Sequence, residues 1–356
     1  MTAPRLEVRL DLIERNTRTL VDRLAPKGIA VHAVTKAALG SPAVARAFIA
    51  GGAAGLADSR AANGERLRAA RIRSPILSIR SPMVSEADRI VRTFETSANT
   101  EHDVITALSA AASAHGWSHG VLLMVELGDL REGILPRDVE VVARHALSLP
   151  SIELRGIGSN LACRSGVIPD DANMAELSDL ATSLERSLGV ALPVVSGGNS
   201  ANLTWALATG DTGRINHLRL GEALLLGCEP LERRPVDGLS TDAFSLVAEV
   251  IESKVKPVQP WGELAQTAFG ERPRRGVGGN AIQTIVALGR QDVDAGDLTP
   301  PAGAVIVASS SDHLVLETDH LLRPGTELAF RPGYAALLRA MTSPFVVTVH
   351  VDAAGG

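Results

Sequence analysis

The feature that most constrains this chain of 356 residues is a regular alternation of patterns between residues 29 and 220. Short apolar runs, bounded by Gly, Pro, Ser or Asn, alternate with stretches of helical periodicity such as 43–49, 62–71, 139–149 and 174–188. The eight runs cover residues 29–35, 55–57, 75–79, 93–97, 121–127, 152–158, 193–196 and 215–220. Strands that alternate with helices pair in parallel. Eight such units predict a closed (β/α)8 barrel, and an open doubly wound sheet is the alternative.

The pattern changes after about residue 235. Runs typical of strands follow one another there, mostly without long helical stretches between them, at 244–255, 281–288, 304–308, 314–317, 327–330 and 345–351. We therefore predict a barrel domain over residues 1–235 and a mainly β domain over residues 236–356. The first ten or so residues are a candidate to pack with the β domain.

Charge and cysteine content narrow the function classes. The net charge is -5 with basic and acidic residues interspersed, which argues against a nucleic-acid partner. The only two cysteines, Cys163 and Cys228, form neither a disulfide framework nor a zinc pattern, so a reducing cytoplasm fits and no metal site is expected. The chain start has no apolar signal region, and no apolar stretch is long enough to suggest a membrane span.

Lys36 ends the first apolar run of the predicted barrel. The chain has only four lysines, because arginine supplies most of its positive charge. A solvated surface lysine is the simpler interpretation. A lysine at a strand end is also suited to lose its proton when desolvated and to attack a carbonyl group.

Glycine-rich loops follow the last two predicted barrel strands. The segment SGGNSANL, residues 196–203, opens a helix, and RLGEALLLG, residues 219–227, adds a glycine after the eighth strand. Backbone N–H groups in such loops bind phosphate, and barrels often bind phosphate after strands seven and eight. A simple helix cap by Asn199 or Ser200 is the alternative. A phosphate beside a lysine that attacks carbonyl groups indicates pyridoxal phosphate.

These segments resemble the alanine racemase-like enzymes that use pyridoxal phosphate, and are most similar to the branch with ornithine racemase and related amino-acid racemases. The motifs occur in family order over nearly the whole chain: VRLDLIERN, AVTKA, GLADSRAAN, GIGSNLAC, SGGNSANL, RLGEALLLG, GRQDVD, SSSDHLVLE and GYAALLRAMTSPF. The resemblance implies that Lys36 bonds covalently to the cofactor and moves the α-proton on one face. It implies further cofactor contacts from Asn160, Asn199, Ser200, Arg219, Gly221, Glu222 and Tyr334, and a substrate contact from Arg131.

The resemblance also implies that Arg219 faces the pyridine nitrogen of the cofactor. An arginine stays protonated and does not readily give that nitrogen a full proton. The ring is then a weaker electron sink, which suits rapid reprotonation at the α-carbon and disfavours transamination.

Racemisation by two bases needs a second acid/base on the opposite face. In alanine racemases this is a tyrosine of the partner subunit's β domain, and the comparable stretch here, residues 256–270, has no tyrosine. We favour His313 or Asp292 for this role, and Cys163 is a third candidate. Asp292 or Asp294 could instead bind a distal substrate ammonium, and Lys36 could also act alone on both faces.

The predicted function is therefore that of a pyridoxal phosphate-dependent amino-acid racemase. It would remove the α-proton of an ornithine-like, other basic or small amino acid and return it on either face, in a cytoplasmic homodimer. Two alternatives remain: a pyridoxal phosphate-binding homeostasis protein without strong catalysis, and a lyase or decarboxylase of the same fold.

Overall fold

The computed structural model describes residues 3–267, 269–270 and 278–351. The chain divides into two compact units. One unit is Leu10–Thr241, and the other combines residues 3–9 with the described residues from Asp242 onward. Residues 236–241 remain with the first unit because they fold back onto it: the N–H of Val236 donates to the carbonyl oxygen of Gly227 at 2.8 Å, and the N–H of Ser240 donates to Oδ1 of Asn16 at 2.7 Å.

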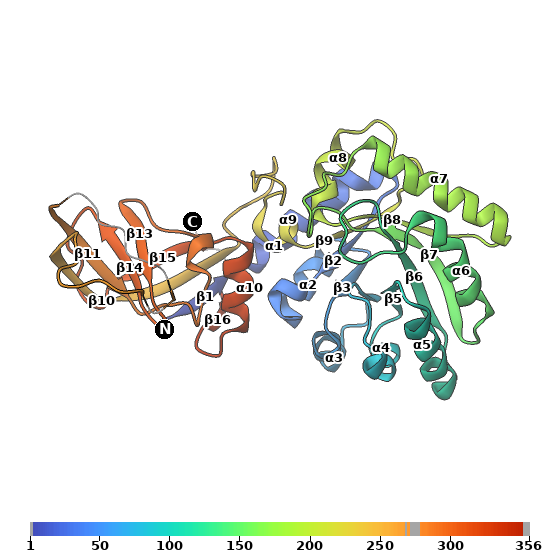
Figure 1. Ribbon diagram of the computed structural model, residues 1–356, viewed down its shortest axis with the longest axis horizontal. Coiled ribbons are helices and arrows are strands. Elements are labelled where there is room, and N and C mark those ends of the chain that lie inside the picture. Colours follow the sequence, from blue (N-terminus) through green and yellow to red (C-terminus); the bar gives the residue numbers. More distant parts are fainter. Residues whose placement is uncertain (1–2, 268, 271–277, 352–356) are drawn as a thin grey trace. The chain divides into compact units, whose positions relative to one another are not determined.

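The first unit contains a closed parallel barrel, which confirms the predicted fold class (Figure 1). Within the described residues its strands are β2 (Ala30–Val34), β3 (Gly55–Asp58), β4 (Ile76–Ser78), β5 (Thr96–Asn99), β6 (His119–Val125), β7 (Ile152–Ser159), β8 (Val194–Gly198) and β9 (His217–Leu220). The pairing of β2 with β9, with Ala33 opposite Leu220, closes the ring and rules out an open sheet. Its interior is filled by small and branched apolar side chains, among them Val34, Leu77 and Leu122.

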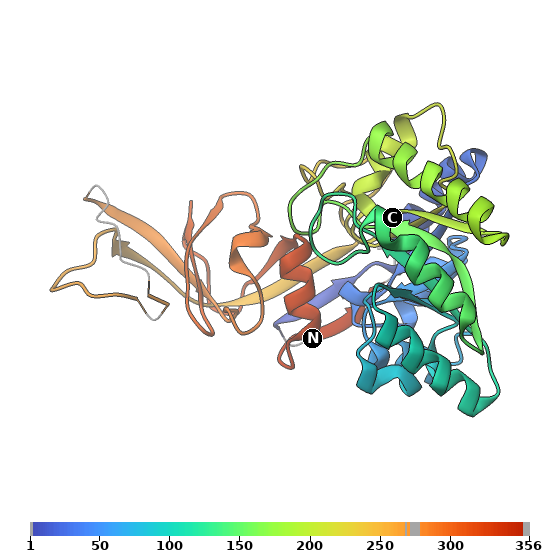
Figure 2. The same cartoon turned by 45° about the vertical axis from the view of Figure 1, so that its right-hand side comes forward.

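Helices surround the barrel on its outer side in both views (Figures 1 and 2). They are α1 (Leu10–Leu24), α2 (Pro42–Ala50), α3 (Ala61–Ala69), α4 (Ala87–Thr93), α5 (His102–His115), α6 (Val139–Ser148), α7 (Asp171–Leu188), α8 (Leu203–Ala208) and α9 (Glu222–Leu226). Short 3-10 helices are η1 (Ala25–Lys27), η2 (Lys36–Ala38), η3 (Val84–Glu86), η4 (Pro136–Asp138) and η5 (Ser200–Asn202). Helix α7 shows how the sequence sets such boundaries. Asp170 and Asn173 form a capping box at its start, and Gly189 ends it in the left-handed region at φ 69°.

One predicted strand begins too early. The run 93–97 was expected to be extended from its first residue, but Thr93 is the last residue of α4 and β5 begins at Thr96. The N–H of Phe94 donates to the carbonyl oxygen of Ile90 at 2.9 Å, which completes the last helical turn. Phe94 is buried at the helix end, so its hydrophobicity reports packing of the helix rather than a strand.

The second unit is mainly β, as predicted. Its strands are β1 (Arg5–Val8), β10 (Phe244–Pro257), β11 (Asn280–Val286), β12 (Leu298–Thr299), β13 (Ala304–Ser309), β14 (Leu314–Thr318), β15 (Glu327–Pro332) and β16 (Val347–His350). The sheet runs in the order β12-β15-β10-β11-β14-β13, and β1 pairs with both β10 and β16. Its helical elements are η6 (Ala295–Asp297) and α10 (Tyr334–Thr342), a helix that the strand pattern did not reveal.

No helix in the described part of the chain is both long and apolar enough to cross a membrane. For function, the important feature of the barrel is the edge at which its parallel strands end. Loops after β2, β7, β8 and β9 carry most of the predicted site residues, and they meet at this edge because the strands are parallel.

Candidate active site at the carboxyl end of the barrel

Lys36 lies directly after β2, as the first residue of η2, and is half-buried. Its Nζ has no hydrogen-bond or ion-pair partner among the described residues. The other three lysines each contact a carbonyl or carboxylate oxygen. Lys36 is therefore the lysine whose amine is available to a ligand.

The surroundings of Lys36 favour the neutral amine. Burial is the largest cause that lowers its pKa, and the positive charge of Arg131 lowers the pKa further. Negative charges at Asp58 and Glu132 oppose this effect without cancelling it. An amine with a lowered pKa is the form needed for attack on a carbonyl carbon.

Asp58, at the end of β3, supports the segment that precedes Lys36. Its carboxylate accepts hydrogen bonds from Oγ1 of Thr35 at 2.6 Å, from Nδ2 of Asn63 at 3.0 Å and from the N–H of Arg60 at 3.0 Å. Burial raises the pKa of Asp58, although these hydrogen bonds act in the opposite direction. Because its acceptors are used inside the protein, Asp58 fixes the loop rather than offering a ligand contact.

Arg219, in β9, is buried with 4 % of its surface exposed. Nη1 donates to Oγ of Ser196, and Nη2 donates to the carbonyl oxygen of Ser159 at 2.7 Å. Nε has no acceptor among the described residues. Burial lowers the pKa of Arg219 to about 10, which still leaves the guanidinium charged at neutral pH. The side chain is thus held on two sides, with Nε left to donate to a ligand.

Two histidines that sequence reasoning missed, His217 and His32, continue the hydrogen bonds of Ser196 along the neighbouring strands. Nδ1 of His217 is hydrogen-bonded to Oγ of Ser196 at 2.7 Å, and Nε2 of His217 is hydrogen-bonded to Nδ1 of His32 at 2.8 Å. Burial, followed by the charge of Arg219, lowers the pKa of His32 to about 4. Burial also lowers the pKa of His217, so both rings are neutral. Spacing gave a usable signal, since residues 217 and 219 of one strand share a face.

Ser200 and Gly221 form a small backbone cradle after β8 and β9. Oγ of Ser200 accepts hydrogen bonds from the N–H of Gly221 at 3.2 Å and of Ala223 at 3.3 Å. A Cβ at Gly221 would lie 3.1 Å from Cβ of Val34, so a side chain at position 221 would be tight against β2. Hydroxyl and N–H groups converge here as a phosphate site requires.

Asn199, Asn160 and Glu222 complete the loops that sequence reasoning singled out. Asn199 caps η5 through Oδ1, which accepts from the N–H of Ala201 at 2.7 Å, so the predicted helix-cap alternative holds as a structural role. Its Nδ2 donates to Oδ1 of Asn160 at 3.1 Å and thereby joins the loops after β7 and β8. The carboxylate of Glu222 forms an ion pair with Arg233 at 3.2 Å, on the first turn of α9.

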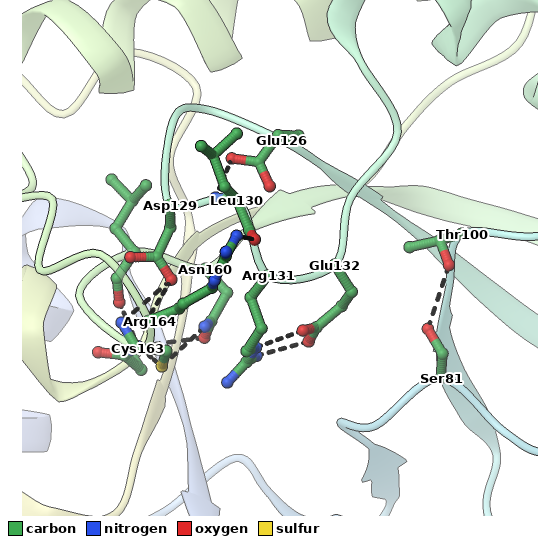
Figure 3. Close-up of polar contacts among 12 residues, drawn as sticks. Ser81, Thr100, Glu126, Asp129, Leu130, Arg131, Glu132, Asn160, Cys163 and Arg164 are labelled. Carbon is green, nitrogen blue, oxygen red and sulfur yellow. Dashed lines mark hydrogen bonds and ion pairs between the residues drawn. The ribbon is translucent and has the colours of Figure 1, made fainter.

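Arg131 lies on the loop between β6 and α6, and its side chain points toward the loop after β7 that carries Asn160 and Cys163 (Figure 3). Its guanidinium makes two contacts with the carboxylate of Glu132, so the two residues form a bidentate ion pair. The charge of Arg131 lowers the pKa of the Lys36 amine, and the charge of Glu132 raises it. Glu132 is a further residue that the sequence did not single out, because adjacent opposite charges are common on protein surfaces.

Asp292, His313 and Tyr334 belong to the second unit, and their predicted roles stay predictions. Asp292 is buried, and its carboxylate accepts from the N–H of Gly289 and from Oγ of Ser343, each at 3.1 Å. Nδ1 of His313 is paired with the neighbouring Asp312 at 2.7 Å. Tyr334 is half-buried and begins α10. Across the described ranges, no three His, Cys, Asp or Glu side chains are grouped so that they could hold a metal ion.

Comparison with known proteins agrees with this geometry. Residues 8–229 match the family model of the alanine racemase N-terminal domain. Lysine racemase of Thermotoga maritima is 36% identical over 98% of this chain and 99% of its own length. Ornithine racemase of Acetoanaerobium sticklandii is 36% identical over 82% of this chain and 83% of its own length.

Solved structures share the fold at lower identity. Alanine racemase of Streptomyces coelicolor A3(2) has a TM-score of 0.76 at 20% identity and covers 98% of this chain and 97% of its own. D-threonine aldolase of Filomicrobium marinum has the same TM-score at 18% identity, over 100% of this chain and 92% of its own. At such identities the likeness concerns the fold alone. The family match and the two long relatives show that this chain belongs to the alanine racemase family.

Proposed function

We propose that the protein is a pyridoxal phosphate-dependent racemase of basic amino acids, with lysine and ornithine as the first substrates to test. The observation that carries this proposal is the near full-length match, at 36% identity, to a lysine racemase, together with the shorter match to an ornithine racemase. The cofactor and the substrate class come from this relationship. The residues at the barrel edge are then assessed for their fit to both.

The described residues fit the cofactor in three respects. Lys36 offers a half-buried amine without a partner, which suits a covalent bond to the aldehyde carbon. Arg219 keeps Nε without an acceptor, which suits the pyridine nitrogen. Ser200 and the N–H of Gly221 would hold the phosphate, in a loop whose glycine allows close approach. Asn160, Asn199, Glu222 and Tyr334 are the further contacts that we propose from the family resemblance.

When bound, pyridoxal phosphate stabilises negative charge at the α-carbon of the amino acid. Lys36 would take the α-proton on one face, because its lowered pKa makes the neutral amine more available as a base. Arg131 would hold the substrate carboxylate while Glu132 restrains its guanidinium. In the proposed arrangement the two roles belong to different residues: the guanidinium of Arg131 binds the substrate carboxylate, and the neutral amine of Lys36 moves the α-proton.

We also infer that the protein acts in the cytoplasm as a homodimer, which is the arrangement that the family resemblance implies. The two alternatives are a pyridoxal phosphate-binding homeostasis protein, here called the carrier, and a lyase or decarboxylase. Each would give different products from a racemase, so one assay of the products separates the three functions.

The experiment is chiral analysis of products after purified protein and pyridoxal phosphate are incubated with single enantiomers of lysine, ornithine, arginine, alanine and serine. We expect interconversion of lysine or ornithine in both directions and none with Lys36→Ala. Lys27→Ala is a matched control. Lys27 lies away from the site, and its Nζ already donates to the carbonyl oxygen of Thr209 at 2.6 Å. Bound cofactor without any turnover would favour the carrier, and cleaved or decarboxylated products would favour the lyase.

A further inference from the structure

The thiol of Cys163 contacts Asn160 and Asn199, in the loops after β7 and β8, and its side chain is exposed. Nδ2 of Asn160 donates to Sγ at 2.9 Å, and Nδ2 of Asn199 donates to it at 3.4 Å. Both contacts use the sulfur as an acceptor. The S–H hydrogen therefore has no acceptor among the described residues and is available to a molecule at the barrel edge.

The backbone that carries this thiol is held in place by Asp129 (Figure 3). Oδ2 of Asp129 accepts from the N–H of Cys163 at 3.2 Å and of Arg164 at 2.9 Å, and Oδ1 accepts from the N–H of Ser165 at 3.0 Å. Asp129 is buried with 1 % of its surface exposed. A carboxylate that binds three successive N–H groups fixes the loop, which gives the sulfur a defined position.

The sulfur and the amine of Lys36 reach the barrel edge from different sides. Lys36 follows β2 and Cys163 follows β7, and in the closed ring β8 and β9 separate these two strands. Contacts between the intervening loops nevertheless connect the two sides. Asn199, which contacts Sγ of Cys163, precedes Ser200, and Oγ of Ser200 accepts from the N–H of Gly221 at 3.2 Å. Gly221 in turn lies against Val34, two residues before Lys36. A ligand held between Lys36 and Arg219 would thus have the amine of Lys36 on one side, and the thiol of Cys163 would reach it from the loop after β7.

The other two candidates for the second acid/base, Asp292 and His313, belong to the second unit. Both carboxylate oxygens of Asp292 accept hydrogen bonds, from Gly289 and Ser343. Nδ1 of His313 is paired with Asp312, and its Nε2 has no partner among the described residues. Of the three candidates, Cys163 is the one that belongs to the same unit as Lys36.

We propose that Cys163 is the second acid/base, acting on the face of the α-carbon opposite Lys36. This inference rests on the proposed racemase function. In one direction the Lys36 amine takes the α-proton, and the thiol gives its proton to the α-carbon from the other face. One C–H bond breaks and one forms, which leaves an ammonium and a thiolate. In the reverse direction the thiolate takes the proton and the ammonium returns one.

No oxidant or reductant is involved. After each turnover the ammonium of Lys36 and the thiolate of Cys163 return to their starting states by exchanging protons with water. In D2O each turnover therefore places solvent deuterium at the α-carbon. Without the thiol, Lys36 alone would still exchange the α-hydrogen of the enantiomer that faces it, but it would return the deuteron to the same face.

The test compares Cys163→Ala with the wild type in D2O, loaded with pyridoxal phosphate, on each enantiomer of lysine and of ornithine. Chiral chromatography measures racemisation, and proton NMR measures loss of the α-hydrogen. We expect racemisation to fall by at least about 100-fold, the usual size of a general acid–base contribution. Exchange of one enantiomer only should continue within roughly tenfold of the wild-type rate, since Lys36 is intact. Cys228→Ala, the other cysteine of the chain, should match the wild type in both measurements.

If Cys163→Ala racemises its substrate at a rate within about threefold of the wild-type rate, the inference is overturned. So small a decrease is far below the effect expected for loss of a general acid or base. Loss of exchange with both enantiomers would overturn it as well, since the residue would then only support the loop. A wild-type protein that neither exchanges nor racemises any substrate would reject the proposed function itself. That outcome is distinguishable because it is seen before any variant is compared.

Discussion

Nη2 of Arg219 donates a hydrogen bond to the backbone carbonyl oxygen of Ser159 over 2.7 Å. Arg219 lies in β9 and Ser159 ends β7, so the guanidinium spans the position of β8 inside the barrel. From β8, Ser196 accepts from Nη1 of the same guanidinium. One buried cation therefore ties three adjacent strands together just below the proposed cofactor site.

Ser196→Ala tests this link. The substitution removes the acceptor of Nη1 and the partner of His217, and it leaves buried polar groups unpaired. We expect the free energy of unfolding of the cofactor-free protein to fall by about 1–3 kcal/mol. Urea titration measures the loss, with the exposed Ser187→Ala as the control. An unfolding midpoint equal to that of the control would show that the Arg219 contact contributes nothing to stability.

Arg131→Gln tests the electrostatics around Lys36. Burial and, further, the charge of Arg131 lower the pKa of the amine, so removing this charge should raise that pKa. Less neutral amine is then present at a given pH, and reaction of cofactor-free protein with pyridoxal phosphate should need a higher pH. The rise of the visible absorption band, followed against pH, measures the shift. Arg137→Gln, on an exposed side chain, should leave the profile unchanged; a shift of Arg131→Gln toward lower pH would contradict the assignment.

His119, at the start of β6, tests how buried histidines shape acid stability. Burial lowers its pKa from the ordinary 6.5 to about 4, so the unfolded chain binds more protons than the folded chain between these values. The contribution of neutral His119 to the free energy of unfolding is therefore fully present above about pH 6.5. It decreases as the pH falls toward the folded-state pKa.

From about pH 7 to about pH 5, the contribution of His119 to this loss is about 2 kcal/mol. His119→Gln should reduce the pH dependence of the urea midpoint by a corresponding amount. The exposed His102→Gln serves as the control and should keep the wild-type dependence. Equal dependence in both variants would rule out His119 as a cause.

The eight apolar runs were sufficient to predict the barrel because parallel strands are buried on both faces and read as continuous hydrophobic segments. The positions of candidate site residues were predictable where these residues directly follow strands, as with Lys36 and Gly221. His217 was missed because, although its spacing from Arg219 puts the two on one face, a polar residue inside an apolar run does not reveal which residues it contacts. The contact between His217 and His32 depends on closure of the ring between β9 and β2, which is a tertiary event.

The long loops were the least predictable part. Residues 128–134 and 160–166 have neither helical nor strand periodicity, and their conformation depends on the contacts of Asp129 with the N–H groups of Cys163 and its two successors. Such contacts join segments over 30 residues apart in the chain, so no local signal encodes them. For the same reason, the sequence suggested Cys163 only as one of three acid/base candidates.

Asp129→Asn tests this anchoring directly. The asparagine side chain keeps one acceptor oxygen but turns an N–H donor toward backbone donors, so the loop should open more often. We expect amide hydrogen exchange of residues 163–165 to accelerate by at least about tenfold, as for a local opening. Peptides elsewhere in the barrel should keep wild-type exchange, and Asp138→Asn, on an exposed carboxylate, should change nothing. Unaltered exchange at 163–165 would contradict the role of Asp129.

The central claim is that the amine of Lys36 bonds covalently to pyridoxal phosphate, and one chemical measurement tests it most directly. The protein is loaded with the cofactor, treated with borohydride to reduce the carbon–nitrogen double bond, digested and analysed by mass spectrometry. With only four lysines in the chain, the labelled site is unambiguous. We expect the reduced cofactor on Lys36. A label confined to Lys27, Lys254 or Lys256, or no label at all, would contradict the claim.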